Sequence, residues 1–371
     1  MNRDAADIAV IGAGIMGSSA AWQLSRRGHR VTVFEQFELD HTRGSSHGAG
    51  RIFRLAYPQT DYVRLAQMAR PEWHKLEREL EQTVLDTTGA LDFGPPGAIH
   101  QLISALSDAG ARFERYSRTR AERRFGVQNL PETWEAILQP DGGVSSADLA
   151  RAGLLHLAEQ NGAKVEARTS VLSLGADEEG ASLETTRGIV HADTVVVTAA
   201  GWSNRLLAPL GLAVSVTPTR ETVVYYDMPA GGAILPSIWH TSPENPFYWL
   251  PNGPRREFKG GWHGVGPAVD PDSEASLDSK QERDTIQFFS QHIRGLSSSP
   301  RSSETCLYAS TPDDDFVLDR SGRIVIATGF GGHGFKFGPV IGKIVADMVE
   351  GQPPPFADRF SRARFASAAT T

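Results

Sequence analysis

Apolar runs and helix-like patterns alternate at the start of the chain, and this order predicts a nucleotide-binding α/β unit. Residues Ile8 to Ile11 form a short apolar run, which is typical of a buried strand. A helical segment with apolar residues on one face follows, and Gly28 is its expected end. A second strand, Val31 to Phe34, leads directly into Glu35. Strand, helix and strand in this order indicate a parallel sheet covered by helices.

The turn after the first strand has the pattern G-x-G-x-x-G, formed by Gly12, Gly14 and Gly17. The first glycine permits a tight turn, the second lets the backbone approach a pyrophosphate, and the third lets helix and strand pack closely. The N-terminus of the following helix presents free N–H groups to an anion. Glu35 stands where a carboxylate can bind ribose hydroxyls. Together these features predict dinucleotide binding rather than a merely glycine-rich turn.

Later segments predict that this nucleotide domain is discontinuous and that a second sheet is inserted in it. The apolar run 194–197 is expected beside the first strand, and the segment 148–160 is expected to be a helix. The run 324–327 leads into a helix whose first turn contains Pro339. By contrast, residues 214–226 resemble a long strand of an antiparallel sheet. We expect a Rossmann-like domain from residues 1–85, 145–213 and 312–371, and a mainly antiparallel-sheet domain from residues 86–144 and 214–311, so the fold class is α/β plus α+β.

Two segments are expected to interrupt regular structure. Residues 40–54 are rich in small residues and are expected to form an irregular loop that carries His47, Arg51 and Arg54. This pattern alone fits a functional loop and a solvated basic loop equally well. The helical region 61–85 should break or kink at Pro71.

Composition narrows the class of protein. With 371 residues, 40% hydrophobic and 22% charged, the chain can build two globular domains. A net charge of −7 with scattered arginines argues against nucleic acid as a partner. No apolar run approaches the ~18–20 residues needed to span a membrane, and the first strand starts too early for a signal peptide, so we expect a cytoplasmic protein. The single cysteine, Cys306, excludes an intrachain disulfide.

A glycine-rich segment near the C-terminus predicts which dinucleotide is bound. Residues 329–338 contain five glycines, among them Gly331, Gly332 and Gly334, and also Lys336. Backbone N–H groups and a lysine at this place could stabilise the negative charge that a flavin gains on reduction. A glycine-rich loop that caps a sheet is the alternative. A nicotinamide enzyme seldom needs its last helix to complete the nucleotide domain, so FAD is favoured over NAD.

Seven short motifs carry a family resemblance, and they lie at residues 12–17, 44–47, 51–54, 248–251, 259–263, 306–308 and 331–337. With them the chain resembles the monomeric sarcosine oxidase and N-methyltryptophan oxidase family of FAD-dependent amine oxidases. The resemblance implies an oxidase of N-methyl or other secondary α-amino acids. Such an enzyme oxidises the amine to an imine, which hydrolyses to an aldehyde and an amine, while O2 is reduced to H2O2. It also implies a monomer that needs no metal.

The resemblance assigns roles to residues around the flavin. Cys306 matches the cysteine that forms a thioether with the flavin ring; read alone, it is a small buried apolar residue. Arg51 and His47 match residues that lie close to the flavin. Lys259 matches the lysine that speeds the reaction with oxygen, although most lysines are simply solvated. The remaining residues expected to hold the cofactor are Gly12, Gly14, Gly17, Glu35, Ser45, Val171, Gly331, Gly332, Gly334 and Lys336.

The resemblance also assigns the substrate contacts. Arg54 and Lys336 match the pair of cations that binds the substrate carboxylate. Tyr248 and His263 match residues that touch the substrate, although alone they would be a strand core residue and a hydrogen-bonded polar residue. Trp249 replaces a residue that is often small, and we expect its ring to add bulk next to Tyr248.

Other departures from the family pattern affect the substrate prediction more than the reaction type. Ser46 replaces a second histidine, and Ala49 and Gly50 replace an acidic residue and a threonine. Polar contacts near the flavin are therefore expected to be fewer. A cyclic imino acid oxidase and an FAD-dependent amine dehydrogenase stay open as alternatives. A flavin-binding subunit without turnover is a more remote one, because such a subunit has no need of Arg54, Lys259 and Lys336.

Overall fold

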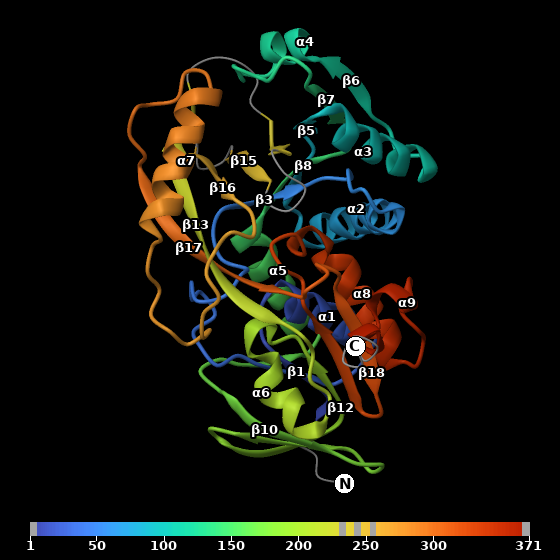
Figure 1. The fold of residues 1–371 in the computed structure, drawn as a ribbon. Coiled ribbons are helices and arrows are strands. Elements are labelled where there is room, and N and C mark those ends of the chain that lie inside the picture. Colours follow the sequence, from blue (N-terminus) through green and yellow to red (C-terminus); the bar gives the residue numbers. More distant parts are fainter. Residues whose placement is uncertain (1–5, 230–234, 241–245, 253–256, 366–371) are drawn as a thin grey trace.

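The computed structural model describes residues 6–229, 235–240, 246–252 and 257–365. These residues form two eight-stranded sheets and one three-stranded sheet, with helices between and around them (Figure 1). None of the helices in this part of the chain is long and apolar enough to cross a membrane.

The first sheet is the predicted nucleotide-binding sheet. Its centre is β1 (Ala6–Ile11), which pairs in parallel with β2 (Val31–Phe34) and with β12 (Gly188–Val197). β19 (Ile324–Thr328) extends this sheet in parallel with β12, as expected for the apolar run near the C-terminus. The other strands of this sheet are β9 (Lys164–Glu166), β10 (Val171–Ala176), β11 (Ala181–Thr185) and β18 (Val317–Ser321).

Helices from three parts of the chain pack together near the centre of the molecule. α1 (Ile15–Arg26) contacts both α5 (Ala147–Gln160) and α8 (Gly338–Val349), and the three lie close together in Figure 1. A Cβ at Gly342 of α8 would lie 2.4 Å from the backbone of Ser19 in α1, so these two helices approach each other very closely. The N-terminal and C-terminal segments therefore share one core.

The second sheet is mainly antiparallel. Its strand order is β17-β13-β16-β15-β14-β5-β7-β6. The strands are β17 (Ser302–Ser310), β13 (Thr217–Asp227), β16 (Glu257–Trp262), β15 (Phe247–Asn252), β14 (Ser237–Trp239), β5 (Ala90–Gly94), β7 (Glu135–Gln139) and β6 (Glu114–Ser117). α7 (Ser279–His292) packs on β13 and β16, at the left of Figure 1. The predicted fold class, α/β plus α+β, is confirmed.

The remaining elements connect these two sheets. β3 (Gly50–Phe53), β8 (Gly143–Ser146) and β4 (Leu85–Asp86) form the small sheet. The other helices are α2 (Thr60–Leu80), α3 (Pro96–Asp108), α4 (Arg118–Arg124), α6 (Ser203–Leu207) and α9 (Ala357–Phe360), and the 3-10 helices are η1 (Ala200–Trp202), η2 (Ala208–Leu210) and η3 (Phe335–Phe337).

Two local expectations need correction. The segment 40–54 is not irregular throughout, because its last part forms β3 and pairs with β8, with Arg51 opposite Ser145. α2 continues through Pro71 and ends at Leu80, so of the expected break or kink the break does not occur. Buried Ala69 and Trp73 on either side of the proline hold the helix against the core, which compensates for the lost backbone hydrogen bond.

Candidate active site

A single cavity of about 900 Å³ extends from the carboxyl end of β1 to the second sheet. Of the residues predicted to form the site, the cavity is lined by Gly12, Gly14, Glu35, Ser45, His47, Arg51, Arg54, Val171, Tyr248, Lys259, His263, Cys306, Gly331, Gly332, Gly334 and Lys336. The exception is Gly17. The fold thus brings together residues that lie more than 300 positions apart in the chain.

The glycine turn at the first end of the cavity has no room for side chains. Gly12 has a φ of +101°, and a Cβ there would lie 2.9 Å from the carbonyl oxygen of Thr198. A Cβ at Gly17 would lie 1.8 Å from the carbonyl oxygen of Gly12. Gly17 therefore sits behind the turn and lets α1 pack against it, while Gly12 and Gly14 face the cavity.

Glu35 is held rigidly at the end of β2. Its Oε2 accepts a hydrogen bond from the Ala13 N–H at 2.9 Å, and its Oε1 accepts one from the Phe37 N–H at 3.0 Å. The side chain is buried but still lines the cavity. A fixed carboxylate at this point suits the hydroxyl pair of a ribose.

Ser46 is a site residue whose position the sequence did not indicate. Its Oγ accepts a hydrogen bond from the Ile15 N–H at 3.0 Å, in the first turn of α1. A Cβ at Gly14 would lie 3.2 Å from the same Oγ. Ser46, which departs from the family pattern, therefore accepts a hydrogen bond from one of the free backbone N–H groups at the N-terminus of α1.

Arg51 and His47 lie in the middle of the cavity. The guanidinium of Arg51 donates hydrogen bonds to the carbonyl oxygens of Gly50 at 2.9 Å, Ser45 at 2.8 Å and His47 at 2.7 Å. Burial and the nearby cations Arg51 and Lys259 lower the pKa of His47 to about 4, so its ring is neutral. The Nε2 atom of His47 is buried and has no hydrogen-bond partner in the described part of the chain.

Cys306 lies on β17 and Lys259 on β16, the two strands that pair with opposite edges of β13. Burial raises the pKa of the Cys306 thiol, while the nearby cations Arg51 and Lys259 oppose this shift. Lys259 on β16 is only 4% exposed. Its burial, and next the charge of Arg51, lower its pKa to about 7. Its Nζ lies 5.6 Å from the ring centroid of Tyr225.

Arg54 and Lys336, which the resemblance assigns to the substrate carboxylate, both line the cavity. The guanidinium of Arg54 lies 4.2 Å from the ring centroid of Tyr57, and its Nη1 lies 3.6 Å from Oδ1 of Asp92. The Nζ of Lys336 donates hydrogen bonds to Tyr57 Oη at 2.8 Å and to the carbonyl oxygen of His333. Burial and the charge of Arg54 lower the pKa of Lys336 well below its usual value.

The predicted substrate-contact residues line the same end of the cavity. Burial, followed by the charges of Arg54 and Lys336, lowers the pKa of His263 to about 4. The ring of His263 lies 5.3 Å from the ring of Tyr308. A Cβ at Gly332 would lie 2.1 Å from the Tyr308 ring, which explains the glycine at this position.

Comparison with known proteins identifies the family. The sequence model of the family described as FAD dependent oxidoreductase matches residues 7–348 of this chain. The chain belongs to this family. It is 29% identical to monomeric sarcosine oxidase of Bacillus sp. (strain NS-129), over 92% of each protein. It is 26% identical to N-methyl-L-tryptophan oxidase of Yersinia pestis (strain Pestoides F), over 97% of this chain and 99% of that protein. The predicted resemblance is confirmed.

A solved structure with the same fold is that of NikD, described as an unusual amino acid oxidase essential for nikkomycin biosynthesis. It superposes with a TM-score of 0.86 at 29% identity and covers 96% of this chain and 97% of the NikD chain. The protein is thus an FAD-dependent oxidoreductase, and the described residues fit that cofactor. The glycine turn has no room for side chains at Gly12, and Glu35 faces the cavity. The buried Nε2 of His47 has no hydrogen-bond partner among the described residues, so a polar atom of the cofactor could bind it.

The position of Trp249 corrects an expectation about this oxidoreductase. Trp249 is 1% exposed and stacks on Phe93 with ring centroids 5.8 Å apart. Successive side chains of a strand point to opposite faces, so Tyr248 faces the cavity while Trp249 packs in the second core. The tryptophan therefore does not add bulk to the substrate site.

Sequence reasoning missed several residues that support the site. Tyr57 and His333 contact Lys336, and Asp92 lies beside Arg54. The carboxylate of Asp92 is fully buried and accepts hydrogen bonds from Gln139 Nε2 at 2.6 Å and His240 Nε2 at 2.7 Å. A lone acid within the apolar strand β5 was the available signal, because a buried carboxylate requires partners.

Proposed function

We propose that this oxidoreductase is an oxidase of N-methyl or other secondary α-amino acids. It oxidises the amine to an imine that hydrolyses to an aldehyde and an amine, and it reduces O2 to H2O2. The observation that carries the proposal is that Arg54 and Lys336 share one cavity with the dinucleotide-binding turn. The similarity to a sarcosine oxidase and an N-methyl-L-tryptophan oxidase supports it.

The proposed cofactor is FAD, joined covalently to Cys306. Its dinucleotide would be held by Gly12, Gly14, Glu35, Ser45 and Val171, and its ring by Gly331, Gly332, Gly334 and Lys336. When bound, the flavin supplies the two-electron redox chemistry. The domain that holds it would comprise residues 1–85, 145–213 and 312–371, and the substrate domain residues 86–144 and 214–311.

The proposed substrate site is built for a carboxylate. Arg54 offers a planar fork of donors, and Lys336 lines the same cavity within reach of the charge of Arg54. The neutral imidazole of His263 and the phenol of Tyr248 can pack around the amine and its alkyl group. These contacts would fix the C–N bond in one orientation, and such positioning is the main contribution of the protein to catalysis.

Lys259 has a different proposed role. In its charged form it would stabilise the negative charge that develops on oxygen during reduction to H2O2. Its pKa of about 7 means that it carries this charge for only part of the physiological pH range. His47 and Arg51 beside it would fix the polar environment of the flavin ring.

A cyclic imino acid oxidase is the second candidate, because the cavity extends further than an N-methyl group requires. Its lining continues along α3 to Ala98, Gln101 and Leu102. A ring-shaped or bulkier substrate could use this extension.

The test is anaerobic mixing of the yellow holoenzyme with excess sarcosine, followed by the flavin absorbance. We expect bleaching, and after oxygen is admitted in excess we expect one H2O2 for each O2 consumed and the return of the colour once the sarcosine is exhausted. Faster bleaching with pipecolate than with sarcosine would favour the second candidate. Bleaching without reaction with oxygen would indicate a dehydrogenase. No bleaching with N-methyl or cyclic amino acids would contradict the proposal.

A further inference from the structure

The hydrogen bonds of Lys336 match the donor number of a neutral amine. Lys336 lines the cavity and is 4% exposed. A neutral lysine has two N–H donors and one lone pair, whereas an ammonium group has three donors. The described part of the chain gives Nζ two acceptors, Tyr57 Oη at 2.8 Å and the carbonyl oxygen of His333. With both donors used, the lone pair points away from these acceptors.

The acceptor Tyr57 is oriented by a chain of hydrogen bonds. His333 Nε2 lies 3.1 Å from the carbonyl oxygen of Asp314, and a carbonyl only accepts, so this nitrogen carries the proton. In the neutral ring Nδ1 then accepts from the Tyr57 hydroxyl, which lies 3.3 Å away. The oxygen of Tyr57 therefore turns its lone pairs toward Lys336.

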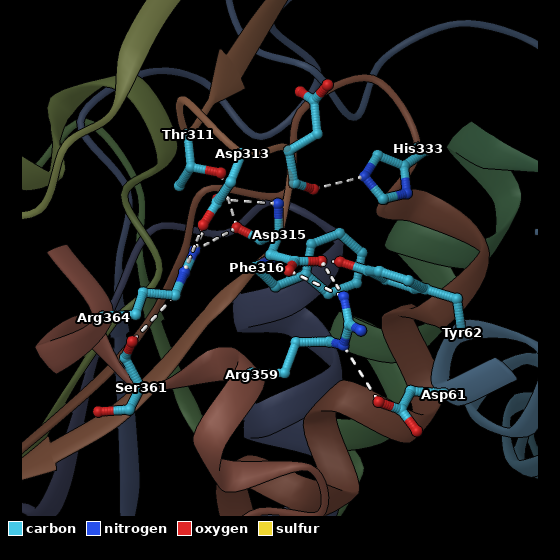
Figure 2. Close-up of polar contacts among 11 residues, drawn as sticks. Asp61, Tyr62, Thr311, Asp313, Asp315, Phe316, His333, Arg359, Ser361 and Arg364 are labelled. Atoms are coloured by element: carbon cyan, nitrogen blue, oxygen red, sulfur yellow. Dashed lines mark hydrogen bonds and ion pairs between the residues drawn. The ribbon is translucent and has the colours of Figure 1, made fainter. Parts of the chain in front are cut away.

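The far end of this chain is fixed to the C-terminal segment. Figure 2 shows His333 beside the loop that follows Thr311. Arg359 Nη1 donates to Asp315 Oδ2 at 2.9 Å, and Arg364 Nε donates to Asp313 Oδ2 at 2.8 Å (Figure 2). These ion pairs hold the loop, and with it the carbonyl oxygen that determines the tautomer of His333.

The two charged groups near Lys336 act in opposite directions, because Arg54 favours the neutral amine and Asp92 favours the charged form, with the effect of Arg54 the larger. Arg54 is a cation near Nζ, and Asp92 is an anion nearby whose carboxylate already has Gln139, His240 and Arg54 as partners. The other titratable groups that face Lys336 are His263, His333 and Tyr57, and burial keeps all three neutral.

We propose that Lys336 rests as a neutral amine and acts as the base that takes a proton from the ammonium group of the incoming amino acid. This inference rests on the proposed function. One N–H bond of the substrate ammonium breaks and one Nζ–H bond forms, so the step needs no other reactant. The substrate keeps the electron pair on its nitrogen, which the oxidation requires. The third donor gained by Lys336 then binds the carboxylate of the same substrate. Tyr57 and His333 are positioning residues in this scheme.

A carboxylate that lacks the ammonium group separates this scheme from a permanently charged lysine. We would use methoxyacetate, in which an ether oxygen replaces the N–H group of sarcosine. The measurements are calorimetry of the holoenzyme in two buffers of different ionisation enthalpy, and flavin absorbance titrations between pH 7 and 9. Because methoxyacetate brings no proton, we expect uptake of nearly one proton per molecule bound and a loss of affinity that approaches about tenfold per pH unit.

The variants identify the group that takes up the proton. Lys336→Arg keeps the charge permanently, so we expect binding without proton uptake and an affinity that does not change with pH. Lys259→Met removes the other buried lysine of the cavity, and here the uptake should persist. Tyr57→Phe removes an acceptor that favours the charged form, so the pH range of uptake should move lower while binding at low pH persists.

Two results would overturn the inference. Methoxyacetate binding to the unmodified holoenzyme without proton uptake would mean that Lys336 does not gain a proton when a carboxylate binds, and the proposed function would still stand. Uptake that persists in Lys336→Arg would assign the proton to another group. If methoxyacetate does not bind and no amino acid bleaches the flavin, the proposed function itself fails, and the inference fails with it.

Discussion

The cavity contains two buried lysines in different surroundings. Comparing them shows how burial and hydrogen-bond partners together determine the role that we propose for each lysine. Lys259 on β16 and Lys336 in η3 are each 4% exposed, and burial is the main cause that lowers the pKa of both. Lys336 donates to Tyr57 and His333. For Lys259 the described residues provide the cation Arg51 and the ring of Tyr225 nearby, and no hydrogen bond to Nζ.

We infer that this difference separates two functions within one site. A lysine whose donors are directed at fixed acceptors has a defined geometry, which suits the binding and deprotonation of a substrate. A lysine without fixed acceptors acts mainly through its charge, which suits the stabilisation of charge on oxygen. Burial alone therefore does not define what a lysine does; its partners do.

The largest expected effect concerns the proposed covalent link between Cys306 and the flavin. Cys306→Ala should leave a flavin that acid precipitation releases completely, because no other cysteine is present. Cys306→Ser is the matched control, since serine keeps the size of the side chain without the thiol. The unmodified enzyme should retain its flavin in the pellet. Flavin in the supernatant of the unmodified enzyme would refute the covalent link and leave the rest of the site in place.

The next effect concerns the proposed carboxylate site of Arg54 and Lys336. Arg54→Ala removes one partner of the substrate carboxylate, and we expect binding to weaken by about 2–4 kcal/mol. Arg54→Lys should recover part of this loss, because it restores the charge without the planar fork. Dissociation constants from anaerobic titration with methoxyacetate measure the effect. Unchanged affinity in Arg54→Ala would place the carboxylate elsewhere.

A smaller effect concerns the pH dependence of the oxygen reaction. Burial lowers the pKa of Lys259 to about 7, so the side chain is charged below this pH and neutral above it. The rate at which reduced enzyme reacts with oxygen should therefore fall as pH rises through 7, by at most about tenfold per pH unit. Stopped-flow mixing of reduced enzyme with oxygen measures this rate. Lys259→Met should show a low rate without this dependence, and the same pH profile in that variant would exclude Lys259 as its cause.

The smallest effect on activity is expected on the opposite face of β15. Trp249→Phe should destabilise the protein by about 1–3 kcal/mol through loss of packing, measured by urea unfolding. The KM for the substrate should stay within about twofold, because the ring lies in the second core. A large change in KM with unchanged stability would show that Trp249 contributes to the substrate site after all.

The sequence predicted those parts of the site that local patterns determine. The glycine turn at Gly12 and the pairing of β1 with β12 follow from short apolar runs and backbone geometry. The strand β3 was missed because its partner β8 lies about ninety residues away, and pairing at such a distance leaves no local signal. The same holds for Tyr57 and Asp92, whose contacts with Lys336 and Arg54 exist only in the folded chain.

The most direct test of the account is to measure the two half-reactions separately in two variants, Lys336→Met and Lys259→Met. Anaerobic mixing with substrate gives the rate of flavin reduction, and mixing of the reduced enzyme with oxygen gives the rate of reoxidation. We predict that Lys336→Met slows reduction and spares reoxidation. Lys259→Met should slow reoxidation by about 100-fold and spare reduction. Loss of the same half-reaction in both variants would contradict the division of roles between the two lysines.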